Sequence, residues 1–302
     1  MSEKGKYIMN TKKIGRRRKY YFVLDCETAT MPHAHDYEGE IRKTIAIAKP
    51  LIYDLGWKLI DSKGNVYRRK SYLITEIFSV PSIFNTAYYA SKRPLYLEKL
   101  RKGEITLTSW ATATADMIAD MDGAEAVGAY NSMFDYKKAI SFTEEYITHL
   151  YSDDYAEWET KQNNRIDYIA THPNGKSTKP FDPEHFTFRN KTYNLFDIWG
   201  LSCEQLLDND DYRKFCVENN LVTNSGKYYS TTAESTYKYI SQNSQFVESH
   251  TAIEDADIEC EILTKIFAKV KPQNMTMGII YFPFRILGRA DLGEIETEEA
   301  VT

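Results

Sequence analysis

The sequence predicts a mixed α/β fold, in which a sheet carries helices on its faces. Two features of the 302-residue chain indicate this class. The uninterrupted apolar run at 20–24 is typical of a central strand that is covered on both faces. Two alternating segments on either side of the turn DSKGN predict a β-hairpin, and further strand-like and helix-like segments follow it.

The predicted strands and helices follow one another along the chain. The first strand, YYFVL, ends at Asp25, and the hairpin occupies 51–75. The later elements are a helix at 108–122, a short buried strand at 124–130, a helix at 133–149, a strand and helix at 192–202, and a final helix from Thr251 to about Lys269. Residues 150–192 are polar and rich in Tyr and Asn, which predicts an insertion with a long loop.

Composition restricts the class of protein. No apolar run is long enough to span a membrane, and the N-terminus lacks the apolar region of a secretory signal. We therefore expect a cytoplasmic protein without a membrane partner. The four cysteines show no CxxC spacing and no nearby paired histidines, so the sequence indicates neither a zinc knuckle nor a disulfide framework.

Charge is unevenly distributed along the chain. Residues 1–20 carry eight basic side chains against Glu3, a local charge of +7 that leaves −12 for the remainder of a chain with net charge −5. We predict a basic N-terminal tail at 1–18, which either contacts phosphates or an acidic surface, or is a solvated leader. At the other end, residues 271–302 are predicted to form a C-terminal docking segment, GIIYFPFRIL, and an acidic tail. The alternative for the apolar segment is a partner-binding role.

Two carboxylates follow the first strand. Asp25 and Glu27 are two residues apart, so on an extended chain they point to the same side. Like charges in one small volume repel, and a divalent cation such as Mg²⁺, which prefers oxygen ligands, would neutralise them. The pair therefore indicates a metal site, and the alternative is a strand that runs into an acidic loop.

A second acidic position follows the short strand at 124–130. In AYNSMFD, Asn131 closes the strand and Asp135 lies in the first turn of the next helix. The spacing from Ser132 to Asp135 is also that of a capping box, in which the acid serves only the helix N-terminus.

A third position begins the final helix. Thr251 and Glu254 have capping-box spacing, which makes Thr251 the expected N-cap. His250 then occupies N′ and Asp255 occupies N4, the two positions that a hydrophobic staple brings together. A histidine there is a candidate general base, because its unperturbed pKa of about 6.5 lies near working pH. The alternative is a helix-start histidine with a surface acid. The other acids of this helix are expected to be capping or solvated charges: Glu254, Asp257, Glu259 and Glu261.

The three motifs together resemble a known family. DCET at 25–28, NSMFD at 131–135 and HTAIED at 250–255 are similar to the three exonuclease motifs of the DEDDh, or DnaQ-like, 3′-to-5′ exonucleases. The resemblance covers roughly residues 19–270, with an insertion at about 150–192. It implies a ribonuclease H-like fold, with a five-stranded mixed sheet and helices on both faces.

The resemblance also implies roles for individual residues. Asp25, Glu27 and Asp255 would hold a first Mg²⁺ or Mn²⁺, and Asp25 and Asp135 a second, so that two ions clamp the attacking and leaving oxygens at phosphorus. His250 would take the proton from the attacking water. Thr28, Asn131 and Phe134 would touch the terminal nucleotide, although Asn131 is equally a helix-start residue and Phe134 a core residue.

Two further segments are candidates for the mouth of the site. The YYASKR segment at 88–93 combines aromatic and basic side chains, as single-strand channels do, and its alternative is helix-face packing. His33 and His35 follow Glu27 and either line the site or are solvated.

The leading functional expectation is a metal-dependent 3′-to-5′ exonuclease that acts on the 3′ end of single-stranded DNA, with a polymerase as an expected partner if it proofreads. One alternative is RNA trimming by the same site, because no motif reports on contacts to the 2′-hydroxyl. The other is a binding module that keeps the nuclease fold and grips nucleic acid or protein.

Overall fold

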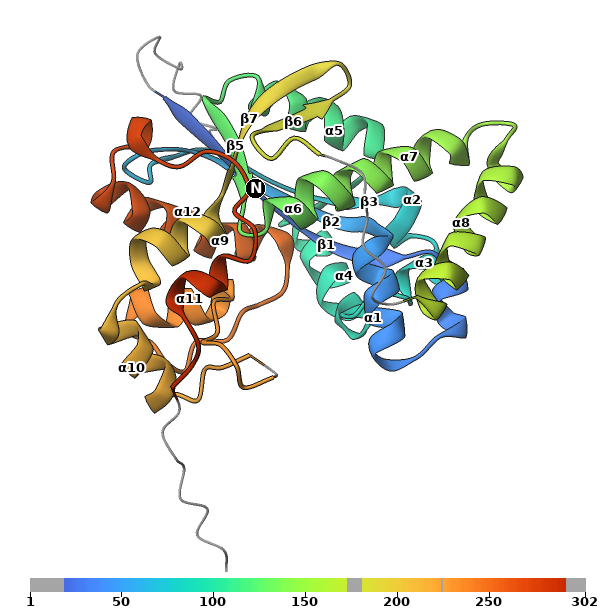
Figure 1. Ribbon diagram of the computed structural model, residues 1–302. Helices are drawn as coiled ribbons and strands as arrows, with labels where there is room; N and C mark the ends of the chain where they lie inside the picture. The colour runs from blue at the N-terminus through green and yellow to red at the C-terminus, as the bar shows by residue number, and fades with distance from the viewer. Residues whose placement is uncertain (1–18, 173–180, 224, 292–302) are drawn as a thin grey trace, which may run out of the picture.

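One seven-stranded sheet organises the computed structural model, which describes residues 19–172, 181–223 and 225–291 (Figure 1). The strand order is β4-β3-β2-β1-β5-β7-β6. The strands are β1 (Tyr20–Thr30), β2 (Pro50–Asp61), β3 (Val66–Ile74), β4 (Thr106–Thr108), β5 (Ala126–Ala129), β6 (His185–Phe188) and β7 (Lys191–Asp197). The mixed α/β class is confirmed, whereas the expected number of five strands is wrong.

The two additional strands lie at the edges of the sheet. β4 has three residues and pairs with β3, and β6 has four residues and pairs with β7 through a turn at Arg189 and Asn190. Both turn residues have positive φ, 44° and 66°, as tight hairpin turns require. Strands this short carry too little alternation to be detected in the sequence.

The predicted hairpin and central strand are confirmed, but the predicted end of the first strand at Asp25 is wrong, because β1 continues to Thr30 and pairs with β2 along its whole length. β2 lies antiparallel to both β1 and β3, and β1 lies parallel to β5. The register between β1 and β2 shifts between Glu27 and Thr28, so a bulge follows the two acids of the first motif. Bulges re-aim side chains and are frequent next to functional sites.

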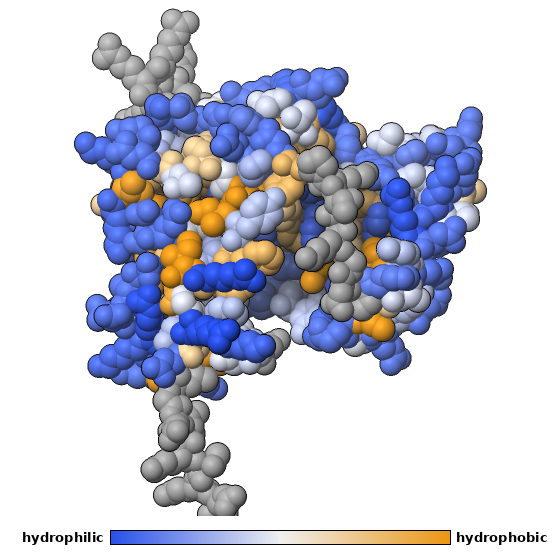
Figure 2. Space-filling view, in the orientation of Figure 1, coloured by the Kyte–Doolittle hydropathy of each residue, from blue (hydrophilic) through white to orange (hydrophobic). Residues whose placement is uncertain are grey.

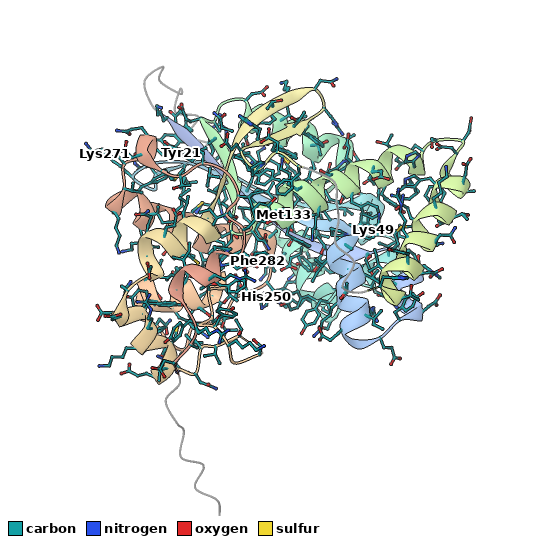
Figure 3. All side chains as sticks on the ribbon, viewed as in Figure 1. Tyr21, Lys49, Met133, His250, Lys271 and Phe282 are labelled. Carbon is teal, nitrogen blue, oxygen red and sulfur yellow. The ribbon has the colours of Figure 1, made fainter. Side chains whose placement is uncertain are left out.

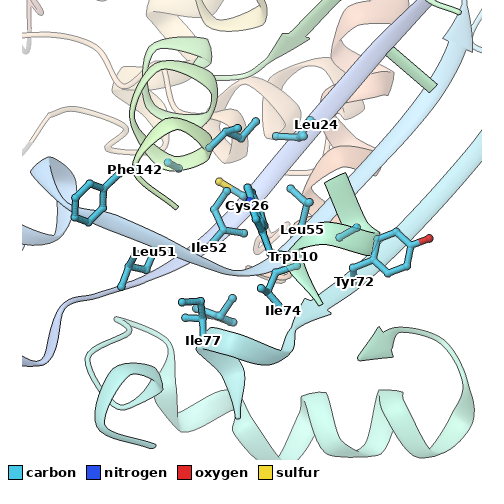
Figure 4. Close-up of a cluster of buried hydrophobic side chains, with 14 of the residues drawn as sticks. Leu24, Cys26, Leu51, Ile52, Leu55, Tyr72, Ile74, Ile77, Trp110 and Phe142 are labelled. Carbon is cyan, nitrogen blue, oxygen red and sulfur yellow. The ribbon is translucent and has the colours of Figure 1, made fainter. Parts of the chain in front are cut away.

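Alternate side chains of β1 enter two separate hydrophobic clusters. Tyr20, Phe22 and Leu24 belong to a cluster with Trp57 and Trp110, part of which Figure 4 shows. The intervening side chains, Tyr21 and Val23, belong to a second cluster with helix α12 (Ala252–Lys269). Because a buried strand with both faces covered needs apolar residues at every position, this explains the unbroken run that the sequence shows.

Helices cover both faces of the sheet (Figure 1). The last four, α9 to α12, form one side of the molecule in Figure 1, and α1, α7 and α8 lie on the other. The helices are α1 (Gly39–Ala48), α2 (Thr75–Phe78), α3 (Pro81–Phe84), α4 (Arg93–Lys102), α5 (Trp110–Met121), α6 (Ser132–Phe134), α7 (Ser141–Leu150), α8 (Tyr155–Thr171), α9 (Ile198–Ser202), α10 (Asp210–Glu218), α11 (Ala233–Ser241) and α12 (Ala252–Lys269), with a π-helical turn at Asp135–Ile140.

The expectation of a long loop at 150–192 is wrong for most of that segment. It contains helix α8, which spans 17 residues, and strand β6. The side chains that α8 buries are Trp158, Gln162, Ile166 and Ala170, a spacing of four that keeps them on one face. The amide of Gln162 is buried beside Lys49, whose Nζ donates to Oε1 at 2.7 Å. A polar residue at a core position hid the helical pattern.

The apolar segment at 278–287 lies against the body. Gly278 N–H donates to the carbonyl of Leu195, and Leu287 is buried. Tyr281 and Phe282 stay exposed, at 59% and 56% of their surface. The basic tail at 1–18 and the acidic tail after 291 lie outside the described residues. Across the described ranges, no helix combines the length and hydropathy that a membrane span needs.

Candidate functional site

The acids of the first motif face helix α12. Tyr21 and Val23 point into the cluster that α12 completes, and the period of two along a strand places Asp25 on the same side. Glu27 follows on the same side. Both acidic residues are partly exposed to solvent. Asp25 and Glu27 therefore share one side of β1, as predicted, although they lie within the strand and not at its end.

A close helix-to-strand contact positions the third motif. Gly56 pairs with Asp25, and a Cβ on Gly56 would lie 2.4 Å from the backbone nitrogen of Ile253. Only glycine allows the first turn of α12 to approach β2 this closely. Asp54 Oδ2 also accepts from the N–H of Ala252 at 3.0 Å, so a carboxylate of β2 satisfies the helix N-terminus.

The capping box at Thr251 differs from the expected one. Thr251 is the N-cap residue, but its hydroxyl donates to Glu254 Oε2 at 2.8 Å and makes no side-chain bond to the helix N–H groups. Asp54 takes over this capping function from across the sheet. Asp54 was missed in the sequence, where a lone acid within the apolar run LIYDLGW is the feature that marks it.

His250 and Asp255 come together as predicted, and Glu27 joins them. One ligand atom from each of these three residues lies within 4.8 Å of the others, a separation at which they could hold one metal ion. His250 has a left-handed backbone, with φ of 50°, which turns the chain just before the helix. The staple positions N′ and N4 thus bring an imidazole and a carboxylate to one point.

Asp135 reaches the site from the end of β5. It is 4% exposed, and its Oδ1 accepts from the thiol of Cys26 at 3.1 Å. The capping alternative for Asp135 is wrong, because Asn131 is the N-cap of α6 and accepts from the N–H of Phe134 at 3.2 Å. Ser132 is buried and donates to the carbonyl of Phe196.

Burial and mutual repulsion dominate the electrostatics of the cluster. Burial, then neighbouring carboxylates, raise the pKa of Asp25 well above its usual value. Burial raises the pKa of Asp135 to about 7 and that of Asp255 to about 8. The carboxylates that raise the pKa of Asp25 are, in decreasing order, Glu259, Asp135, Asp255 and Glu27. The site therefore concentrates negative charge that the described residues neutralise poorly.

Glu259 is a fifth carboxylate of the cluster, and the expectation that it is solvated is wrong. It is 2% exposed, and its Oε2 accepts from the N–H of Tyr130 at 3.2 Å. Burial and the charges of Asp135 and Asp255 raise its pKa well above the usual value. The spacing of four from Asp255 to Glu259, one turn on the same helix face, is the sequence feature that identifies it.

The side chain of His250 is held from two directions. Its ring stacks on Tyr89, with 4.4 Å between centroids and 15° between planes. Glu248 Oε2 lies 3.7 Å from His250 Nδ1 on the other side. Lys92 packs over Tyr89 and donates to the carbonyl of Ser249 at 2.5 Å, which fixes the residue before the histidine. Burial and the charge of Lys92 lower the pKa of His250.

Two residues of the 88–93 segment thus reach the site, where Tyr89 contacts His250 and Lys92 contacts Ser249. Tyr88 is 77% exposed and lies edge-on to Tyr89, whereas Arg93 packs over Phe78 and Phe84.

The remaining candidates lie around the cluster. Asn131 is exposed, Thr28 is half-buried in β1, and Phe134 packs against the first hydrophobic cluster. His33 is held away from the site by Asp167 of α8, with 2.6 Å between Nε2 and Oδ1, and His35 is exposed.

The raised carboxylate pKa values predict how stability depends on pH. Without metal, the folded protein holds protons at Asp135 and Asp255 up to about pH 7 and 8, whereas the unfolded chain releases them near pH 4. The folded state binds more protons in this window, so the free energy of unfolding falls as pH rises from about 4 to about 8. Thermal unfolding in EDTA at several pH values measures this.

A divalent cation is expected to reverse that trend, because it binds the deprotonated carboxylates of the folded state. At about a hundredfold excess of Mn²⁺ over its Kd, linkage predicts about 2.7 kcal/mol, or a Tm increase of about 4 °C. The increase should be larger at pH 8 than at about pH 5. An equal increase at both pH values would contradict the carboxylate assignment.

A pair of substitutions tests Glu259. Glu259→Gln keeps an acceptor for the N–H of Tyr130 and removes a buried charge, so the Tm in EDTA at about pH 8 should rise. Glu259→Ala leaves that N–H without its acceptor and should cost about 1–3 kcal/mol of unfolding free energy. Equal destabilisation by both would show that Glu259 carries no unfavourable charge.

Fold and geometry together define an α/β protein with an acidic centre between its central strand β1 and helix α12. Comparison with protein-family models, with curated proteins and with solved structures finds no significant match. The functional argument therefore rests on the chemistry of the site.

Proposed function

We propose that this chain is a metal-dependent 3′-to-5′ exonuclease of the DEDDh type, which removes nucleoside monophosphates from the 3′ end of single-stranded DNA. The observation that carries the proposal is the meeting of three motifs that are distant in sequence. Ligand atoms of Glu27, His250 and Asp255 lie within 4.8 Å of one another, and Asp135 is near enough to Asp25 to raise its pKa.

The arrangement of the sheet supports a ribonuclease H-like core. Without the short edge strands β4 and β6, the order is β3-β2-β1-β5-β7, which is 3-2-1-4-5 in chain order. β2 is antiparallel to its neighbours, and β1, β5 and β7 are parallel. Asp25 and Glu27 lie within β1, next to the carboxyl end of β5 and beside the first turn of α12. In this proposal the core of an exonuclease domain at 19–270 carries two added edge strands and helix α8.

The donor set fits hard divalent cations. Asp25, Glu27, Asp135 and Asp255 offer carboxylate oxygens, the ligands that Mg²⁺ and Mn²⁺ prefer. Burial raises the pKa of all four, and neighbouring carboxylates raise those of Asp25, Glu27 and Asp255 further, an unfavourable charge that a cation relieves. Two such ions, when bound, would neutralise charge that develops on the attacking and leaving oxygens of a phosphodiester.

His250 is suited to accept a proton. Its lowered pKa keeps the imidazole neutral near pH 7, and Tyr89 and Glu248 restrict its orientation. In the proposed reaction a water oxygen bonds to the terminal phosphorus and its proton passes to His250. The bond from phosphorus to the 3′ oxygen of the preceding nucleotide breaks, and that oxygen becomes a hydroxyl. Thr28, Asn131 and Phe134 are the proposed contacts to the terminal nucleotide.

A time course tests the proposal. Single-stranded DNA and RNA of matched sequence, labelled at the 5′ end, are incubated with Mg²⁺, Mn²⁺ or EDTA. Stepwise shortening from the 3′ end that EDTA abolishes supports an exonuclease, and the faster substrate identifies the sugar. Faster RNA shortening would favour the RNA-trimming alternative. Intact substrate with both metals would refute the exonuclease proposal. The alternative that remains is a module that binds nucleic acid or protein. Proofreading would further require that an added polymerase partner stimulates removal of a mismatched 3′ end.

A further inference from the structure

A surface groove adjoins the acidic centre. It has a volume of about 730 Å³, and its lining includes Tyr130, Asn131, Trp199, Thr223, Thr231 and Phe284. We call it the stacking groove. Tyr130 connects it to the cluster, because the N–H of Tyr130 donates to Glu259 while its hydroxyl donates to the carbonyl of Thr231. The groove and the acidic centre therefore share one residue as a wall.

Aromatic rings dominate one side of the groove. Trp199 and Phe284 are stacked, with 6.2 Å between centroids and 23° between planes. The indole N–H of Trp199 donates to Thr231 Oγ1 at 2.8 Å, so the protein satisfies the polar atom of this ring. The ring centroids of Phe282 and Phe284 are 6.1 Å apart. Phe282 is 56% exposed, so it extends the aromatic surface outward. Figure 3 labels Phe282 and His250.

Positive charge borders these rings. The guanidinium of Arg285 lies 4.6 Å from the ring centre of Phe282 and 5.9 Å from that of Phe284. Arg285, Arg289 and Lys227 are all exposed, and no acidic residue is among the described residues that line the groove. Figure 2 shows apolar side chains gathered over this C-terminal segment with strongly hydrophilic side chains directly beside them.

We propose that the stacking groove binds the unpaired nucleotides that precede the 3′ end, by stacking of bases on Phe282, Phe284 and Trp199 and by contact of phosphates with Arg285. Aromatic rings with bordering cations are the surface that single-stranded nucleic acids recognise, because every base has a π-face and every linkage a negative charge. The direction of the strand, toward the acidic centre, rests on the proposed function. DNA and RNA share this chemistry.

Tryptophan fluorescence provides a direct readout. Of the four tryptophans, Trp57, Trp110 and Trp158 are buried, and Trp199 alone is partly exposed. An oligothymidylate of about ten nucleotides, added in EDTA so that no hydrolysis occurs, should quench this fluorescence. In Trp199→Phe the quenching should disappear while binding, followed by anisotropy of a labelled oligonucleotide, remains. An oligouridylate of equal length separates RNA from DNA.

Two exposed positions test the contacts. Phe282→Ala and Arg285→Ala should each weaken binding by about tenfold, and Arg285→Ala should also reduce the salt slope by about one. Tyr151→Ala and Arg165→Ala are matched controls, since both side chains are exposed near or on α8. The controls should bind as the wild type does.

Each failure has a distinct pattern. Unchanged oligonucleotide affinity in Phe282→Ala and Arg285→Ala, with normal hydrolysis by both variants, would refute nucleotide binding by the stacking groove. The exonuclease proposal would be unaffected by that result. Weakened binding in these variants, with no hydrolysis by the wild type in Mg²⁺ or Mn²⁺, would retain the groove and refute the exonuclease. Absence of any oligonucleotide binding would overturn the groove as a nucleic-acid site, and a peptide would then be the better candidate for it.

Discussion

Replacing Asp25 with asparagine is expected to reduce the rate of 3′-end hydrolysis by on the order of 10⁴-fold, equivalent to about 5 kcal/mol of transition-state stabilisation. Burial raises the pKa of Asp25, and four other carboxylates of the cluster raise it further. Asparagine keeps the size of the side chain but cannot supply a negative oxygen to a cation. The increase in Tm on adding Mn²⁺ should fall sharply in this variant.

The same variant should be more stable than the wild type in EDTA at about pH 8, because it removes one charge from a repelling cluster. This combination of higher stability and lost activity separates a functional role from damage to the fold. Asp153→Asn is the control, since Asp153 is exposed between α7 and α8. Retention of more than about a tenth of the wild-type rate by Asp25→Asn would refute the assigned role of Asp25.

The sequence predicts those parts of the site that local geometry determines. The period of two along β1 places Asp25 and Glu27 together, and the staple geometry of α12 places His250 beside Asp255. Each of these pairs is close along the chain. Their spacing alone therefore defines their relation in space, and the unbroken apolar run defines the strand on which the first pair lies.

Contacts between distant segments could not be predicted in this way. A solvated Glu259 is the expectation from sequence, because acids on helices are mostly exposed. However, α12 packs on the second hydrophobic cluster, and the helix face that carries Glu259 is therefore buried. Asp54 caps α12 from β2, and Tyr89 stacks on His250 from the segment after α3. Each depends on tertiary packing that no local pattern contains.

Helix α8 shows the opposite limitation, in which composition conceals a regular element. Its buried face includes Gln162 alongside Trp158 and Ile166, so the hydrophobic period is incomplete. Gln162 is tolerated in the core because its amide bonds to Lys49 and Glu145. The polar side chain that interrupts the pattern bonds to Lys49, the residue after α1, and to Glu145 of α7, and these contacts become apparent only in three dimensions.

Replacing His250 with alanine is expected to reduce hydrolysis by about 10²–10⁴-fold, the range for loss of a general base. The metal-induced increase in Tm distinguishes this role from metal binding, because the three groups Glu27, His250 and Asp255 are also close enough to share an ion. If His250 acts as the base, His250→Ala keeps most of that increase. If His250 is instead a ligand, the increase is lost together with the activity.

The pH profile gives an independent test of the same residue. Burial and Lys92 lower the pKa of His250 below the usual value of about 6.5, so at saturating metal the wild-type rate should fall only at pH values below that of an ordinary imidazole. That acidic limb should be absent from the residual activity of His250→Ala, and added imidazole should restore part of the rate. His35→Ala, which removes an exposed loop histidine, should leave both rate and profile unchanged. An acidic limb that persists in His250→Ala would assign the proton transfer to another group, of which Glu248, with a pKa raised by burial to about 7, is the nearest candidate.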